Sequence, residues 1–234
     1  MQPVFRGPVH RGAAAAAQWK PGGRLGWARG ALGALIGIAL AGLATKMVAY
    51  GDAPWLVAPI GASAVLVFAV PASPLAQPWS VLGGNMISAA IGIALGHAIG
   101  APWLAASLAV GVAIAVMTLA RCLHPPGGAC ALLCALGAKA SGWTFGVLLV
   151  PFLPNVLLLI FAGWVYNGLT GHPWPHRPHP APVLPQGTWA GTYEDADLDA
   201  VLEDWDEVLD VEREDLDALF RALEQRVLQR WQAR

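Results

Sequence analysis

RCLHPPGGA, residues 121–129, is a polar, helix-breaking segment inside a long apolar region of the chain. It combines a cation, a histidine, two prolines and two glycines, whereas a helix that only spans a bilayer needs little beyond leucine, valine and alanine. Polar and helix-breaking residues are costly at membrane depth, and they commonly mark function there. The segment is therefore the first candidate for a functional site.

The prolines of this segment predict where a helix begins. Pro125 disfavours a helical conformation at His124, and Pro126 suits the first turn of a new helix, where its missing N–H group costs nothing. Gly127 and Gly128, followed by Ala129, would then present backbone N–H groups at the positive end of that helix.

This arrangement predicts a cradle for a small anion. Arg121 and His124 precede the helix start and could add positive charge or a proton, and half-helices in transporters aim their N-termini at bound anions in this way. The alternative is a tight turn between two helices, with Arg121 anchored at the membrane interface.

Charge is distributed very unevenly along the chain. Charged residues make up 12% of the sequence and hydrophobic residues 56%. Thirteen of the fifteen acidic residues lie within 194–217. The charged side chains between residues 31 and 172 are Lys46, Asp52, Arg121 and Lys139. A soluble domain could not cover its surface with such a middle region, so we expect an integral membrane protein.

The apolar middle divides into about six hydrophobic segments. They run over residues 30–50, 55–72, 81–100, 102–120, 129–138 and 143–169. Ten residues cannot cross a bilayer core unaided, so the fifth segment is either a short span or a re-entrant half-helix. We expect an all-α fold: a polytopic helical membrane bundle with a small soluble helical tail at its C-terminus.

Four regions follow from these patterns. Residues 1–29 form a basic arm without acids, which the positive-inside rule places in the cytoplasm. Residues 30–170 form the transmembrane domain, 171–192 a proline-rich linker, and 193–234 an acidic tail with helical spacing of its apolar residues. We expect a multi-pass protein of the cell inner membrane with both termini in the cytoplasm. The tail is a solvated helical hairpin or a docking site for a partner.

Small and polar residues mark two further segments. In the third segment Gly84, Gly92, Gly96 and Ser88 belong to a stripe repeated every four residues, which predicts close helix packing within the chain or in a homo-oligomer. Asn85 lies beside the stripe. In the second segment, Ser63 follows a Pro-Ile-Gly break, and with Asn85 it could line a pathway.

The sequence offers little for metal or covalent chemistry. Cys130 and Cys134 lie one helical turn apart near His124, but small packing residues explain them better than a metal site does. The histidines of the linker stand in a flexible proline-rich context. We expect no metal, no cofactor, no nucleic-acid partner and no enzymatic activity; bilayer lipid and a small anion are the expected partners.

The motifs resemble those of the HPP family of integral membrane proteins. Residues 121–129 carry the His-Pro-Pro-Gly-Gly-Ala signature, and the likeness extends to residues 58–64, 71–78, 83–84 and 166–169. One departure is Asn85, where the family pattern suggests histidine after paired glycines; this weakens a proton-linked role there.

The resemblance implies a function. Many bacterial members continue into a pair of CBS domains, and residues 194–223 are similar to the connector that precedes them. We expect the CBS pair to be missing here, and with it regulation by adenine nucleotides. Plant members are implicated in nitrite transport, which implies a transporter or channel for nitrite or a similar small anion. The alternatives are a membrane-embedded sensor or scaffold with a docking tail, and a membrane enzyme that uses His124 and the cysteines.

Overall fold

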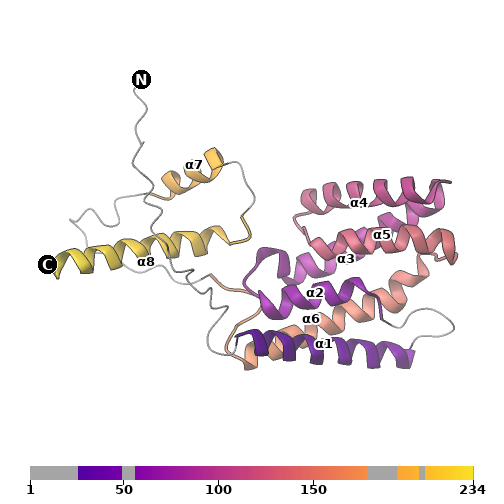
Figure 1. Cartoon of the computed structure of the whole chain (residues 1–234), viewed down its shortest axis with the longest axis horizontal. Helices are drawn as coiled ribbons and strands as arrows, with labels where there is room; N and C mark the ends of the chain where they lie inside the picture. Colours follow the sequence, from indigo (N-terminus) through magenta and orange to yellow (C-terminus); the bar gives the residue numbers. More distant parts are fainter. Residues whose placement is uncertain (1–25, 49–55, 179–193, 206–208, 234) are drawn as a thin grey trace, which may run out of the picture.

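A computed structural model describes residues 26–48, 56–178, 194–205 and 209–233. Six helices form a membrane-type bundle, and two form a tail beyond one end of it (Figure 1). The bundle helices are α1 (Gly26–Val48), α2 (Pro59–Ala69), α3 (Pro78–Ala98), α4 (Pro102–Leu119), α5 (Pro125–Ala140) and α6 (Leu153–Leu169), and the tail helices are α7 (Asp195–Trp205) and α8 (Arg213–Gln232). No strand occurs in the described ranges, so the all-α prediction is confirmed.

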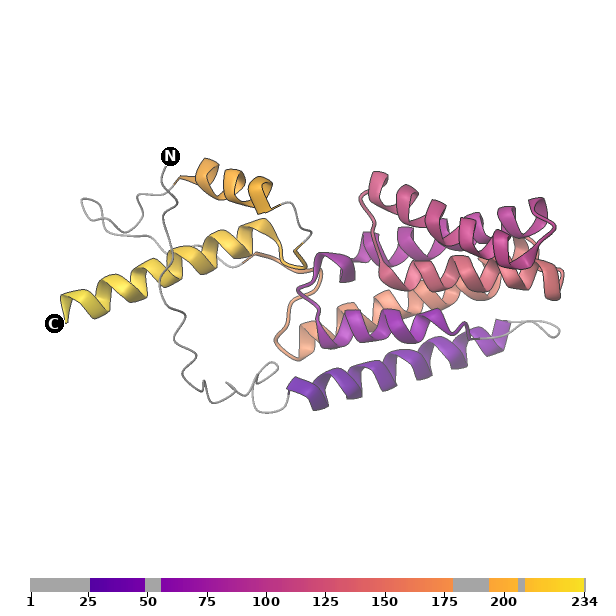
Figure 2. The same cartoon turned by 45° about the horizontal axis from the view of Figure 1, so that its top comes forward.

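The bundle consists of two halves of three helices each. Helices α3, α4 and α5 pack mainly on one another, and α1, α2 and α6 do the same, so that Figures 1 and 2 show two groups side by side. We call these the α3–α4–α5 half and the α1–α2–α6 half, and the interface between them the seam. The seam is formed chiefly where α2 meets α5 and where α3 meets α6.

Four of the bundle helices are long and apolar enough to cross a membrane, and two are short. The four are α1, α3, α4 and the stretch Leu148–Leu169 that contains α6. Helix α2 has 11 residues and α5 has 16. At 1.5 Å per residue they extend roughly 16 and 24 Å, against a hydrocarbon core of about 30 Å. The prediction of about six segments with a short fifth one is confirmed, and the second segment is shorter still.

Several helix boundaries differ from those expected. Helix α1 begins at Gly26, before the expected start at residue 30. Helix α5 spans Pro125–Ala140, so it starts at the prolines as predicted and is longer than the apolar run 129–138 alone. The sixth segment is interrupted at Val150, whose φ of −145° and ψ of 118° are not helical; it precedes Pro151, and the residue before a proline is disfavoured in a helix. The kink lies within the stretch Leu148–Phe152, which leads into α6.

The small-residue stripe of α3 packs against α5 within the chain. A Cβ atom on Gly92 would lie 2.4 Å from the Ala131 carbonyl oxygen, and one on Gly96 would lie 2.6 Å from that of Ala135. The two backbones thus approach as closely as small residues allow. Of the two options the stripe left open, packing within the chain is the one observed.

The bundle exposes apolar side chains on its outside. Large examples include Leu35, Leu43, Trp103, Leu119, Phe161 and Trp164. Polar side chains are instead buried in its interior, including Ser63, Asn85, His124, Asn155 and Asn167. This distribution suits a lipid solvent, in which polar groups must find partners inside the protein.

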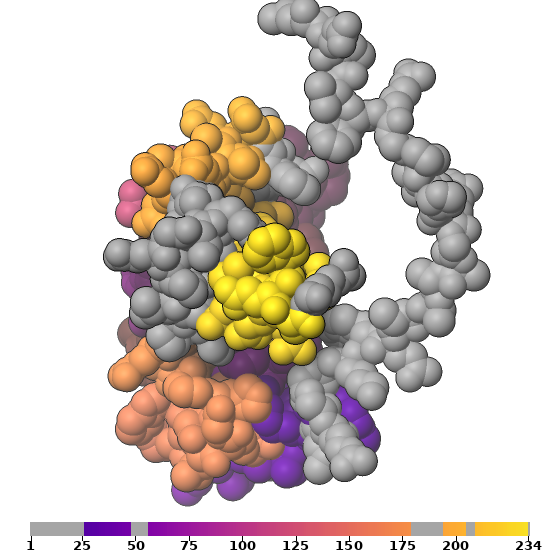
Figure 3. Space-filling view, turned by 90° about the vertical axis from the view of Figure 1, so that its left-hand side faces the viewer, coloured from indigo at the N-terminus to yellow at the C-terminus, as the bar shows by residue number. Residues whose placement is uncertain are grey.

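The tail helices lie beyond the end of the bundle where α1 begins and α6 ends (Figure 3). Arg213 pairs with Asp199 across α7 and α8 at 2.5 Å, and Arg221 pairs with Asp195 at 3.0 Å. The bond from Arg213 lowers the pKa of the Asp199 carboxyl, although both groups lie at the surface. These pairs join the two helices into the hairpin that the sequence predicted.

Candidate functional site

The turn before His124 sets the direction in which α5 starts. Helix α4 ends with the N–H of Arg121 bonded to the Thr118 carbonyl and that of Cys122 bonded to the Met117 carbonyl. This is a Schellman motif, in which the residue at the Arg121 position takes a left-handed conformation and is usually glycine. Arg121 has a φ of 53°, and its side chain is exposed.

His124 is the N-cap of α5 and is fully buried. Its φ of −143° and ψ of 106° are extended, as expected for a residue before Pro125. Gly84 of α3 makes room for the ring, because a Cβ atom there would lie 2.4 Å from the Cβ of His124. Of the paired glycines of α3, Gly84 therefore makes room for the histidine, while Gly83 faces Cys122.

The His124 ring joins the seam to the loop between α2 and α3. Nδ1 lies 2.8 Å from the carbonyl oxygen of Leu75, and Nε2 lies 2.8 Å from the Ser63 hydroxyl on α2. A carbonyl oxygen only accepts, so Nδ1 carries a proton. In the neutral ring Nε2 then accepts, and the Ser63 hydroxyl donates to it.

Two more side chains extend this chain of hydrogen bonds. The Asn85 amide donates from Nδ2 to the Ser63 oxygen at 3.1 Å and to the Val81 carbonyl at 2.8 Å. The Cys130 thiol donates to Asn85 Oδ1 at 3.0 Å. We call Ser63, Asn85, His124 and Cys130 the polar cluster. All four are fully buried, and the cluster links α2, α3 and α5 across the seam.

The N–H groups at the start of α5 are already occupied in this conformation. Of the three first residues without an intrahelical partner, Pro125 and Pro126 carry no N–H, and the N–H of Gly127 bonds to the His124 carbonyl at 2.8 Å. From Gly128 onward each N–H has the usual acceptor four residues earlier. The predicted role of these groups in binding an anion stays a prediction, and it requires a different local conformation.

The two glycines of the motif have different surroundings. A Cβ atom on Gly127 would lie 2.7 Å from the Gly84 carbonyl oxygen and 2.8 Å from the Ser88 hydroxyl. One on Gly128 would meet its nearest neighbour, a methyl of Val110, at 4.0 Å. Gly127 thus permits α5 to contact α3, while Gly128 has no such packing constraint, and Ala129 is exposed.

Two more polar side chains, the partly buried Arg29 and the buried Asn155, join the helices of the α1–α2–α6 half. Arg29 donates from Nη1 to Asn167 Oδ1 at 2.9 Å and from Nη2 to the Phe68 carbonyl, near the end of α2, at 2.8 Å. A cation there suits the negative end of the α2 dipole. Farther along, Asn155 donates to the Thr45 hydroxyl at 2.7 Å and accepts from the Val57 N–H at 3.1 Å.

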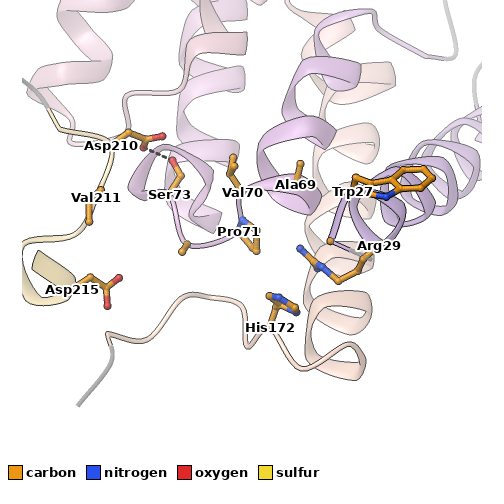
Figure 4. Close-up of a pocket in the computed structure, with 12 residues that line it drawn as sticks. Trp27, Arg29, Ala69, Val70, Pro71, Ser73, His172, Asp210, Val211 and Asp215 are labelled. Atoms are coloured by element: carbon orange, nitrogen blue, oxygen red, sulfur yellow. Dashed lines mark hydrogen bonds between the residues drawn. The ribbon is translucent and has the colours of Figure 1, made fainter. Parts of the chain in front are cut away.

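A cavity of about 640 Å³ lies between the bundle end and the tail (Figure 4). Arg29 and His172 lie on one side of it, and Asp210 and Asp215 lie on the other. Neither Ser63 nor His124 is among its lining residues, so in this conformation the polar cluster is closed off from the cavity.

The structure brings some of the predicted site residues together and separates others. Ser63, Asn85 and His124 form one hydrogen-bonded cluster, whereas Arg121 is exposed at the end of α4. From the sequence, Cys130 is expected to be a packing residue, and the Leu75 carbonyl is not expected as a partner of His124. Cys130 follows His124 by six residues, less than two helical turns, and this proximity was the available signal. A backbone carbonyl leaves no signal in the sequence.

Metal binding receives no structural support. In the parts of the chain that the structure describes, no three His, Cys, Asp or Glu side chains gather in a way that could hold a metal ion. Cys130 and Cys134 are both buried, and the Cys130 thiol is engaged with Asn85.

The apolar exterior, the buried polar interior and the broken helices define a multi-pass helical membrane protein. The sequence model of the family described as "HPP, transmembrane region" matches residues 21–175. The chain belongs to this family.

Relatives with curated names are transmembrane proteins too. The chain is 38% identical over 116 residues to one transmembrane protein of Dictyostelium discoideum, covering 48% of this chain and 41% of that protein. It is 34% identical over 148 residues to a second one from the same organism, covering 61% and 47%. The chain thus matches less than half the length of either relative. No solved structure matches it.

Proposed function

We propose that the chain is a membrane transporter or channel for a small inorganic anion, and that Ser63, Asn85 and His124 form its binding site when the two halves separate. The observation that carries the proposal is the polar cluster itself. It consists of donors buried at the seam, between two helices that are too short to cross the bilayer. Transporters commonly bind substrate where broken helices meet and move one half against the other.

The cluster is suited to small anions by its chemistry. A hydroxyl, an amide NH₂ and an imidazole N–H are all hydrogen-bond donors, and no carboxylate contacts them among the described residues. In the closed state each donor is satisfied by a neighbour. Separation of the halves would break the Ser63–His124 bond, and a buried unsatisfied donor costs about 1–3 kcal/mol. An anion oxygen that accepts a hydrogen bond from the freed donor offsets that cost, so the open state is the one that binds the anion.

The basic residues before α1 predict how the bundle is oriented in the membrane. We place the end of the bundle that carries the tail in the cytoplasm, because the arginine-rich arm precedes α1 there. The inner membrane is the corresponding location. Arg121 is exposed at the end of α4 and can attract anions to that surface. Nitrite is the first substrate to test.

Flux across proteoliposomes tests the proposal. Nitrite, nitrate and chloride uptake should be measured for the parent chain, for Ser63→Ala and for Ser107→Ala, an exposed serine of α4. Loss of a donor to a charged ligand predicts roughly tenfold slower flux for Ser63→Ala. Ser107→Ala should conduct like the parent. The proposal fails if none of the anions moves, or if Ser63→Ala transports like the parent while both variants remain folded.

The Ser63–His124 bond favours a second candidate function, since a hydroxyl 2.8 Å from an imidazole is also the arrangement of a nucleophile and its base. The imidazole would remove the hydroxyl proton. A fluorophosphonate probe distinguishes an enzyme from a transporter. An enzyme would be labelled at Ser63, and its Ser63→Ala variant would not be labelled. Transport predicts no labelling, because opening of the seam separates Ser63 from the imidazole that would activate it.

A sensor or scaffold function would depend on the tail as a docking site. Helix α8 exposes Leu219, Leu223 and Trp231, which could receive a partner. If docking is the function, removing residues 209–234 should abolish it while leaving any anion flux intact.

A further inference from the structure

The loop between α2 and α3, residues 71–77, lies between the tail and the polar cluster. It contains a short 3₁₀ helix, η1 (Pro74–Ala76), whose N-cap is Ser73. On the bundle side, the Leu75 carbonyl accepts the hydrogen bond from His124, and the Pro74 carbonyl accepts one from Ser80 at 3.0 Å. The loop therefore fixes the ring on which the cluster depends.

On the other side the same loop is bound by the tail and its linker. The Ser73 hydroxyl donates to Asp210, which precedes α8, at 2.5 Å (Figure 4). The Gln77 side chain accepts from the His176 backbone N–H at 2.8 Å, and the Trp174 indole donates to the Ala76 carbonyl at 3.2 Å. His176 in turn pairs with Asp215 of α8 at 2.6 Å.

Ser73 connects the tail to the polar cluster, with Leu75 as the one residue between Ser73 and His124. Its hydroxyl donates to Asp210 and at the same time accepts from the Leu75 N–H at 3.1 Å. The Leu75 carbonyl then accepts from His124 at 2.8 Å. The route from the tail carboxylate to the buried ring thus consists of three hydrogen bonds and one residue of backbone. Bonds in such a series polarise and strengthen one another.

We propose that the tail is a latch on the polar cluster: while Asp210 holds Ser73, the loop keeps the Leu75 carbonyl on His124 and the seam stays closed. Release of the tail frees the loop and lets His124 leave Ser63. The inference rests on the proposed function only for what the latch regulates, namely anion flux.

The cavity between the tail and the bundle end agrees with a latch that can lift. It separates Arg29 and His172 from the two tail carboxylates, so the contact between tail and bundle is incomplete there (Figure 4). Among the described residues, the tail bonds to the loop at Ser73 and to the linker at His176, while Gln77 and Trp174 join the linker to the loop. A few localised polar bonds are easier to release than a continuous apolar interface.

Labelling of Cys130 reports opening of the cluster without reference to transport. Cys130 is fully buried and bonded to Asn85, and the sequence has two other cysteines, Cys122 and Cys134. In a background with both of these changed to alanine, the rate of reaction with N-ethylmaleimide measures how often the seam opens. The full chain in proteoliposomes is compared with the variants Asp210→Ala, Ser73→Ala and the double change, with Asp204→Ala on α7 as the matched control.

If the tail holds the seam closed, Asp210→Ala should let it open more often and raise the Cys130 labelling rate about fivefold or more, within the range of typical allosteric couplings. Asp204→Ala should label like the background. The double change should label no faster than the faster single variant, because both remove the same link. The latch is overturned if Asp210→Ala labels like the background.

Anion flux is measured on the same vesicles. Faster labelling together with altered flux supports the latch and the transport function. Faster labelling without any flux supports the latch and refutes transport. Flux that depends on Ser63 but not on Asp210, with unchanged labelling, refutes the latch and leaves transport standing.

Discussion

The two halves of the bundle are held together by different means. In the α3–α4–α5 half, glycines bring backbone against backbone, as at Gly92 and the Ala131 carbonyl. In the α1–α2–α6 half, glycines face aromatic rings: Cβ atoms on Gly33 and Gly37 would meet Phe68 or Tyr166. Rings can shift, whereas a helix backbone cannot. The comparison indicates one rigid half and one half that can adjust, with the polar cluster between them.

The largest effect is expected from a methyl group placed between α3 and α5. Gly92→Ala would bring its Cβ within 2.4 Å of a backbone oxygen, so the helices must separate. We expect a loss of about 3 kcal/mol in the free energy of unfolding, the upper range for overpacking. Gly111→Ala on α4, with nothing within 4 Å, is the control and should be neutral or slightly stabilising. Unfolding in mixed detergent measures both, and equal stabilities would contradict a rigid half.

The neighbouring glycines of the motif provide a sharper test within the same half. Gly127→Ala would place a methyl 2.7 Å from the Gly84 carbonyl, so we expect a loss of about 2 kcal/mol. Gly128→Ala should gain up to about 1 kcal/mol, because alanine favours a helix over glycine. Thermal unfolding of the two variants should therefore move in opposite directions. Flux by Gly128→Ala that falls despite this stability would point to a site at the helix start.

A smaller effect is expected in the α1–α2–α6 half. Gly33→Ala would place its Cβ 2.6 Å from a ring carbon of Phe68 and 2.7 Å from one of Tyr166. Tyr166 is only partly buried and can turn, whereas the buried Phe68 must shift, so we expect a loss of about 1 kcal/mol, the lower end for overpacking. The same unfolding assay applies. A loss as large as that of Gly92→Ala would remove the distinction between the halves.

The smallest effect is expected at the turn between α4 and α5. Arg121→Gly relieves a left-handed conformation at φ 53° and should stabilise the fold by about 1 kcal/mol or less. Its flux separates the predicted electrostatic role from a structural one. Uptake slower than the parent's at low salt, with the difference lost at high salt because salt screens the parent's charge, would show that the charge attracts the anion.

The sequence was a good guide where a residue has a fixed backbone preference. The apolar runs predicted the helical bundle, and Pro125 correctly predicted an extended His124 followed by a helix start. The four-residue repeat of small residues correctly predicted close packing on α3, although two outcomes remained open until α5 was seen to occupy that face.

What the sequence could not supply was the set of partners. Hydrogen bonds between residues 63 and 124, or 75 and 124, depend on how helices distant in sequence come together. The donors predicted at Gly127 to Ala129 also depend on the turn: two prolines precede them, the Gly127 N–H is bonded to the His124 carbonyl, and the next N–H groups have helical acceptors. The cluster at the seam became visible only with the fold.

The order of the donors in the polar cluster has an electrical consequence. From Cys130 through Asn85 and Ser63 to His124, each hydrogen points the same way, and the chain ends on a backbone carbonyl. A proton wire needs members that can accept a proton on one side and release another on the other. A carboxamide does not do this readily, so Asn85 interrupts the wire. The bundle can therefore keep a polar interior without conducting protons along the polar cluster.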